Sequence, residues 1–169
     1  MTSIESKNMR FLLAVDESEN ALRAVGYVGS LLNRTPNVMV TLFHVLKPMP
    51  RGLLEHGGSE NPDIEEALGA SLRKEQQVWL KHERETECPI LERACDVLVR
   101  AGFEKSQITI KFGHEGDIAK TILEEARIGR YETIVVGRTG TSGIMRIFGG
   151  SITEYLLRNA RGLALWVIE

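Results

Sequence analysis

Short apolar runs alternate along the chain with longer segments in which apolar residues recur every three or four positions. The runs occupy residues 11–15, 38–46, 108–112, 133–136 and 163–168. Continuous runs of this length are typical of strands in a parallel sheet that is covered on both faces. Helical spacing fills most of the intervals between them. This alternation predicts a single doubly wound α/β domain, with five strands and four helices around a mostly parallel sheet.

The expected helices are bounded by residues that favour helix ends. Asp16 or Ser18 can cap the first helix, and Asp117 can cap the third. Gly102 and Gly129 follow the last turns of the second and third helices, where glycine commonly ends a helix. These signals place the helices in the intervals between the strands.

The segment between the second and third strands is longer and less regular than the others. Residues 47–63 contain three prolines and three glycines without a period, and a loop of this length in a compact domain is usually functional or mobile. We expect a charged helix from Ile64 onward, kinked or restarted at Pro89. The charged residues 73–87 are most simply a solvated helix face, with a protein-binding surface as the alternative.

Composition excludes several functional classes. The chain has 169 residues and a formal net charge of −2, and it is 43% hydrophobic and 26% charged, which suits one globular domain. The near-neutral charge and an aromatic content of 6% argue against a nucleic-acid-binding surface. The polar tail, residues 1–9, lacks the apolar core of a signal peptide, and no apolar run approaches the ~20 residues of a membrane helix. With only two cysteines, the default expectation is a cytoplasmic protein.

The stretch between the fourth strand and the last helix is rich in glycine. Five glycines fall within residues 137–150, together with Arg138 and Arg146. Glycine allows successive backbone amides to approach one anion. Ser151 and Glu154 then form a capping-box pattern at a helix N-terminus, which suits a phosphate. The alternative is ordinary turn chemistry, because short glycine motifs also occur by chance.

Other nucleotide, metal and nucleophile motifs are not found. No Gly-Lys-Ser/Thr follows the glycine stretch, and no Gly-x-Gly-x-x-Gly follows the first strand. His114 has no second histidine at zinc-binding spacing, and Cys88 and Cys95 match no zinc pattern. His44 lies inside a strand and is more simply a satisfied core or edge residue than a base. We therefore expect no protein metal site and assign no catalytic residue.

Four landmarks resemble the universal stress protein family. The glycine stretch reads Gly137, two residues, Gly140, nine residues, Gly150 and Ser151, which is similar to the family's G-x2-G-x9-G-[S/T] nucleotide signature. Ala14 to Ser18 resembles the family's A-V-D-x-S, and Phe43-His44-Val45 resembles its L-H-V. The start of the third helix is also similar, at Gly116, Ala119, Ile122 and Leu123. The resemblance covers residues 10–169, which we interpret as one universal stress protein domain.

The resemblance implies a five-stranded parallel sheet in the order 3-2-1-4-5, with helices on both faces. In that order the first and fourth strands meet where the winding reverses, which is where open α/β sheets bind ligands. It further implies an ATP site, with Mg²⁺ held mainly by phosphates and water. The implied site residues are Ala14, Val15, Asp16, Val45, Gly137, Arg138, Gly140, Gly150, Ser151 and Ile152.

The resemblance also carries a functional expectation. It implies a nucleotide sensor of the stress response that hydrolyses ATP slowly at most, since the sequence shows no placed general base. A nucleotide-free homodimer with an interaction or scaffold role is the alternative. The last strand, residues 163–168, is expected at a sheet edge and, as in the family, to pair with a second copy. Met145 and the Arg161-Gly162 turn depart from the family's usual residues.

Overall fold

The sheet follows the predicted order. The computed structural model describes residues 8–55, 57–114, 116–138 and 152–169. Its strands are β1 (Met9–Ala14), β2 (Val38–Val45), β3 (Ile108–Gly113), β4 (Thr133–Gly137) and β5 (Ala164–Ile168). They are arranged β3-β2-β1-β4-β5, and all neighbouring pairs are parallel. The five-stranded doubly wound sheet is therefore confirmed.

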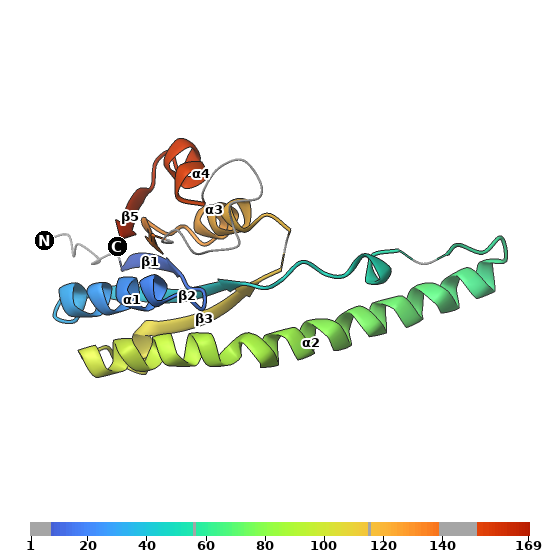
Figure 1. Cartoon of the computed structure of the whole chain (residues 1–169), viewed down its shortest axis with the longest axis horizontal. Coiled ribbons are helices and arrows are strands. Elements are labelled where there is room, and N and C mark those ends of the chain that lie inside the picture. Colours follow the sequence, from blue (N-terminus) through green and yellow to red (C-terminus); the bar gives the residue numbers. More distant parts are fainter. Residues whose placement is uncertain (1–7, 56, 115, 139–151) are drawn as a thin grey trace, which may run out of the picture.

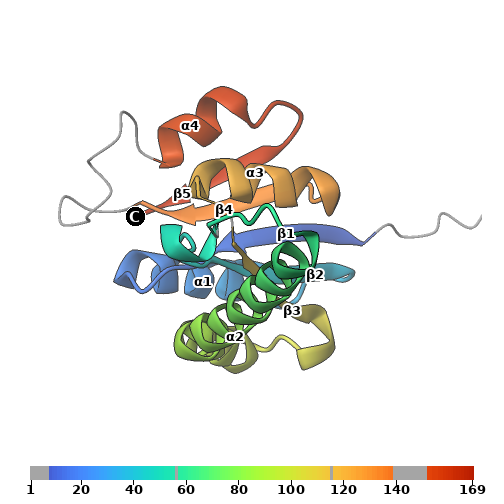
Figure 2. The ribbon, with the colours of Figure 1, turned by 90° about the vertical axis from the view of Figure 1, so that its right-hand side faces the viewer.

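Helices cover both faces of the sheet (Figures 1 and 2). The helices are α1 (Glu19–Leu32), α2 (Pro62–Ala101), α3 (Ile118–Ile128) and α4 (Ile152–Asn159). Helices α1 and α2 pack on one face, and α3 and α4 pack on the other. Two short 3-10 helices, η1 (Arg51–Leu53) and η2 (Lys105–Gln107), lie in the connections on either side of α2.

The central strand explains why the apolar runs are continuous. Leu13 of β1 belongs to the core beneath α1 and α2, and Leu12 belongs to the core beneath α3 and α4. Successive side chains of a strand point to opposite faces of the sheet. Because both faces are covered by helices, the interior of a central strand needs apolar residues at successive positions, here Phe11 to Ala14.

Helix α2 departs from the sequence prediction. Of the kink or restart expected at Pro89, the restart is wrong, because α2 runs as one continuous helix of 40 residues through that position. Proline removes the hydrogen bond to the carbonyl of Glu85, but both residues are exposed, so water can replace that bond. Beyond Pro89, the buried residues Ile90 and Leu91 hold the chain against the core. The helix also begins earlier than Ile64, because the Asn61 side chain caps its first turn.

The N-terminal part of α2 extends beyond the sheet, with the preceding segment running beside it (Figure 1). We call residues 47–88 the arm. Within it, the side-chain amide of Gln76 donates a hydrogen bond of 2.6 Å to the carbonyl of Leu53, which joins the helix to the segment. The first buried residue of α2 is Ile90, so the arm lies outside the core. No described helix, α2 included, combines the length and the apolar character needed to span a bilayer.

Candidate functional site

The carboxyl ends of β1, β2 and β4 meet at one edge of the sheet. In the registers, Ala14 is opposite Phe43 of β2 on one side and Val136 of β4 on the other. The chain continues from these ends into Asp16, Val45 and Gly137. This edge is the point where the winding direction reverses, and in open α/β sheets such a point is the usual position of a ligand.

The described part of the chain brings together most of the residues predicted for the site. Ala14, Val15, Asp16, Val45, Gly137 and Arg138 lie at the carboxyl edge of these three strands. Ile152 begins α4 and packs against the same apolar cluster as Ala14 and Val45. The other three predicted residues, Gly140, Gly150 and Ser151, lie outside the described residues.

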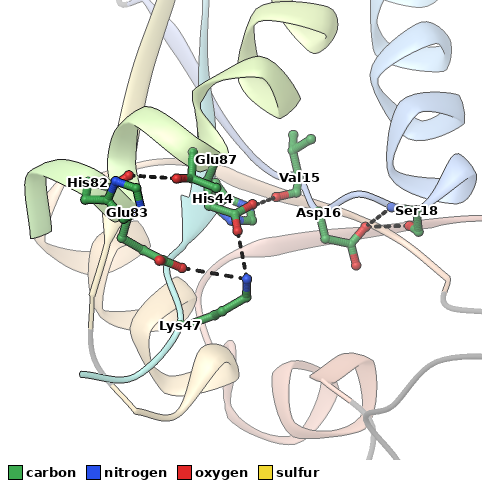
Figure 3. A network of polar contacts seen from close by, with 9 residues as sticks. Val15, Asp16, Ser18, His44, Lys47, His82, Glu83 and Glu87 are labelled. Atoms are coloured by element: carbon green, nitrogen blue, oxygen red, sulfur yellow. Dashed lines mark hydrogen bonds and ion pairs between the residues drawn. The ribbon is translucent and has the colours of Figure 1, made fainter. Parts of the chain in front are cut away.

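Asp16 is held in the turn between β1 and α1. Its Oδ1 atom accepts a hydrogen bond of 2.9 Å from the Ser18 backbone and a second bond from the Ser18 hydroxyl (Figure 3). The Ser18 hydroxyl oxygen in turn accepts a bond of 3.2 Å from the amide of Ala21. Ser18 is therefore the cap of α1, and Asp16 orients the cap. These contacts fix the position of the Asp16 carboxylate at the edge of the sheet.

Gly137 is enclosed by the first turn of α1. A Cβ atom at this position would lie 2.5 Å from the carbonyl carbon and oxygen of Asn20 and 2.7 Å from the amide nitrogen of Ala21. Backbone atoms cannot move aside as the end of a flexible side chain can. The first glycine of the predicted nucleotide signature is therefore required by helix packing, whether or not a ligand is bound.

Arg138 forms side-chain and backbone contacts at the same edge. Its guanidinium pairs with the carboxylate of Glu169, and its backbone amide donates a bond of 2.6 Å to the carbonyl of Ile168. Its own carbonyl accepts a hydrogen bond from the side-chain amide of Asn20. The side chain remains 63% exposed, so the pair with Glu169 is a surface ion pair of small energetic weight.

A polar cluster that the sequence did not predict lies next to this edge (Figure 3). His44 of β2 is 9% exposed, and its Nδ1 atom lies 2.7 Å from the carbonyl oxygen of Val15. On the other side of the ring, Nε2 lies 3.7 Å from a carboxylate oxygen of Glu87 in α2. His44 is thus a buried structural residue, as expected. Its partner Glu87 is distant in sequence and belongs to no motif, so only the folded chain reveals the pair.

Lys47 closes the cluster from the segment that follows β2. Its ammonium lies 3.1 Å from Glu87 and 3.8 Å from Glu83. The hydrogen bond to Glu87, together with the charges of both carboxylates, raises the pKa of Lys47 above its ordinary value of 10.5. A raised lysine pKa stabilises the fold below the ordinary value, and this contribution is lost as the pH rises through the higher one. The ion pairs therefore persist at neutral pH.

The cluster connects the base of the arm to the candidate site. The amide of Val15 donates to the carbonyl of Phe43 at 2.8 Å, and the carbonyl of Val15 accepts from His44. Both polar groups of Val15 are thus held by β2. Glu87 in turn holds the histidine ring from α2. The Val15 backbone, a predicted neighbour of the adenosine, is positioned through His44 and Glu87.

Replacing His44 with alanine is expected to lower the free energy of unfolding by about 1–3 kcal/mol, because the Val15 carbonyl loses its buried donor. Glu87→Gln should cost less, because the amide can still accept a hydrogen bond. Glu85→Gln, on an exposed turn of the same helix, should change stability by less than about 0.5 kcal/mol. Urea denaturation measures all three variants. Equal stability of His44→Ala and the wild type would contradict the role given to this contact.

Solved structures of known proteins share this fold. A universal stress protein family member from Burkholderia pseudomallei is 21% identical, with a TM-score of 0.61 over 96% of this chain and 97% of that one. A family protein from Arabidopsis thaliana, solved with AMP bound, is 14% identical, with a TM-score of 0.58 over 95% and 90%. The universal stress protein from Archaeoglobus fulgidus, solved in complex with dAMP, is 18% identical, with a TM-score of 0.57 over 95% and 98%.

At these identities the structural likeness shows the fold alone. No curated protein sequence gives a significant match to the chain. The model of the universal stress protein family, in contrast, matches residues 7–162, which is most of the chain and includes the sheet edge described above. The sequence landmarks, the strand order and this match agree, and the chain belongs to the universal stress protein family.

Proposed function

We propose that this protein binds an adenine nucleotide, ATP with Mg²⁺, at the carboxyl edge of β1, β2 and β4. The observation that carries the proposal is the convergence of Asp16, Val45 and Gly137 at the point where the winding reverses. Relatives of the same fold have been solved with AMP and with dAMP. The proposed role is that of a stress-response nucleotide sensor with at most slow hydrolysis.

Each part of the nucleotide has a proposed partner. The Asp16 carboxylate, already held by Ser18, would accept a ribose hydroxyl or a metal-bound water. The backbone of Val45 would bond to the adenine edge, while Ala14 and Val15 border the adenosine. Gly137 and Arg138 would line the ribose and phosphates. The proposed phosphate-binding roles of Gly140, Gly150 and Ser151 are based on the sequence signature alone. Ile152 follows them in the chain and would hold the phosphates at the helix start.

Arg138 would contribute positive charge beside the phosphates. Its guanidinium is exposed and paired with Glu169 at the surface. Exposed pairs of this kind contribute little to stability, so exchange of the carboxylate for a phosphate costs little. Mg²⁺ would be held by phosphates and water, which agrees with its preference for retaining several waters.

A nucleotide-free homodimer is the second candidate. The observation that favours it is β5, which forms one edge of the sheet and pairs only with β4 among the described strands. Beside it lies a shallow groove of about 280 Å³, lined by Tyr27, Leu31, Trp166, Val167 and Ile168. Pairing of residues 163–168 with a second copy would cover this edge. The homodimer is compatible with nucleotide binding and does not require it.

Thermal unfolding with and without MgATP tests the proposal. At a free concentration about 100 times the dissociation constant, binding stabilises the folded state by about 2.7 kcal/mol. For a chain of this size, that corresponds to a rise in Tm of roughly 5–10 °C. MgGTP should give a smaller rise, because the proposed base contacts are to adenine, and Asp16→Ala should reduce the rise with MgATP.

Mass spectrometry of the denatured, purified protein gives an independent measure, because a tightly bound nucleotide would be released. An unchanged Tm at millimolar MgATP, together with no released nucleotide, would exclude the nucleotide proposal. An interaction or scaffold role as a nucleotide-free homodimer would then be the favoured function. Sedimentation analysis would test whether the chain forms that homodimer.

A further inference from the structure

One exposed face of the arm carries a regular stripe of residues. Positions 64, 68, 71, 75, 78 and 82 of α2 follow one another at alternating steps of four and three, the spacing of a coiled-coil seam. The residues are Ile64, Leu68, Ser71, Glu75, Val78 and His82. We call this set the arm stripe. Its three aliphatic side chains are 50%, 36% and 63% exposed, respectively.

The chain's own segment does not cover the arm stripe. The half-buried positions of the arm helix (residues 62–88), such as Leu72, Gln76 and Leu80, share one face, from which Gln76 bonds to Leu53 of the preceding segment. The arm stripe lies to one side of that face. Exposed aliphatic residues that recur on one face of a helix are typical of a surface that is covered by another element.

The arm stripe also borders a groove. A shallow depression of about 550 Å³ in the middle of the arm helix is lined by Ser71, Lys74, Glu75, Val78, Trp79 and His82. Trp79 contributes a large, half-buried aromatic surface to it. The groove begins one helical turn after Leu68, at Ser71, and its apolar lining comes from Val78 and Trp79.

Charge is distributed unevenly along the arm. Residues 60–66 carry four acidic residues and no basic one. Residues 72–84 carry four basic residues and two acidic ones, in addition to His82. Two arms packed in parallel would place like charges together. Two arms packed antiparallel would place the acidic end of each against the basic part of the other, which favours that orientation.

We propose that the arm is an interface for a second copy of this chain, with the two α2 helices packed antiparallel about a twofold axis near residue 73. In this register, Leu68 of each copy lies against Val78 of the other, in the groove, and Ile64 lies beside His82. A twofold interface is satisfied by one self-complementary surface. The arm stripe, the groove and the reversed charge together meet this requirement.

The register also respects the shape of the molecule. The tip of one arm, at Pro62, reaches residue 84 of the other arm and stops before the part of α2 that is buried against the sheet from Ile90 onward. The overlap of 62–84 corresponds to roughly 34 Å of helix. This interface is separate from the β5 edge, and it does not depend on a bound nucleotide.

Charge-insertion variants test the interface by sedimentation equilibrium of the full chain. We expect Leu68→Arg and Val78→Arg to weaken association at least about tenfold, because each places a charge in the aliphatic contact between Leu68 of one copy and Val78 of the other. Ala70→Arg and Gln77→Arg introduce the same charge at exposed positions on the opposite face and should associate like the wild type. The weight-average mass of the wild type should reach twice that of the two stripe variants.

Cysteine cross-linking tests the face and the position of the twofold axis. In the proposed register, Lys74 lies beside the twofold axis and faces its own equivalent, whereas Gln77 points away from the partner. Lys74→Cys should therefore form a disulfide-linked dimer under mild oxidation, and Gln77→Cys should not. Cys88 and Cys95 are present in both variants, so they do not account for a difference. Adding Val78→Arg to Lys74→Cys should prevent the cross-link.

Two results would overturn the proposal. If Leu68→Arg and Val78→Arg have the same mass as their controls at every concentration, the arm stripe does not bind a second copy. If those variants dissociate but Lys74→Cys and Gln77→Cys cross-link equally, the placement of the twofold axis beside Lys74 is wrong. Circular dichroism of each variant confirms that the exposed substitutions leave the helix content unchanged.

Discussion

Gly137→Val is expected to lower the free energy of unfolding by about 3 kcal/mol, the upper end of the usual range for overpacking, in the absence of any nucleotide. The new Cβ atom would lie within 2.7 Å of three backbone atoms of Asn20 and Ala21. These clashes can be relieved only if the start of α1 moves away from the end of β4. Because Asp16 and Ser18 form the turn that leads into α1, the same movement should also displace the Asp16 carboxylate. Denaturant unfolding without ligand measures the loss of stability.

Gly52→Val is the matched control for this variant. A Cβ atom at Gly52 meets no atom within 4 Å, so the same substitution there should change stability by less than about 0.5 kcal/mol. If the two variants are equally stable, the close approach of α1 to β4 is incorrect. If only Gly137→Val is unstable, this signature glycine has a packing role. A binding experiment alone would not separate that role from a direct role in nucleotide binding.

Leu91→Ala is expected to destabilise the domain by about 2–5 kcal/mol, the usual range for removing a fully buried leucine side chain. Leu91 is 0% exposed and belongs to the core shared by α1, α2 and the sheet. It lies two residues after Pro89, so it anchors the helix where the local sequence favours a break. Urea denaturation of the full chain measures the effect.

The control is Leu68→Ala on the arm, at a protein concentration too low for arms to associate. Leu68 is on the same helix but outside the core, and its truncation should change stability by less than about 0.5 kcal/mol. A similar cost at both positions would show that the arm is part of the cooperative core. If only Leu91→Ala is destabilising, as expected, the C-terminal third of α2 is the part that anchors the helix to the domain.

The fold was largely predictable because its strands are buried on both faces. A central strand such as β1 needs apolar residues at successive positions, which leaves a continuous run that is visible in the sequence. The caps at Ser18, Asp117 and Gly102 were also predicted, since each depends on the chemistry of a single residue. The strand order came from the family resemblance and is confirmed.

The errors and omissions concern contacts between distant residues. Pro89 predicts a break by its local chemistry, but burial of Leu91 and Leu98 in the core holds the helix on its C-terminal side. The contact between His44 and Glu87 has no sequence signal, because any exposed-looking glutamate of the charged helix could have faced the histidine. Arg138 was predicted beside phosphates, and its pairing with Glu169 depends on β5 lying next to β4.

The contact between Lys47 and Glu87 has a consequence for how this chain can be altered. These two residues lie at the start and the end of the arm, and their side chains are 3.1 Å apart. The arm therefore leaves the domain and returns to it at nearly the same point, as an inserted unit does. Insertions with adjacent ends are tolerated because the surrounding backbone need not move to accept them. Residues 47–88 could thus be replaced by another inserted segment while the α/β domain is retained.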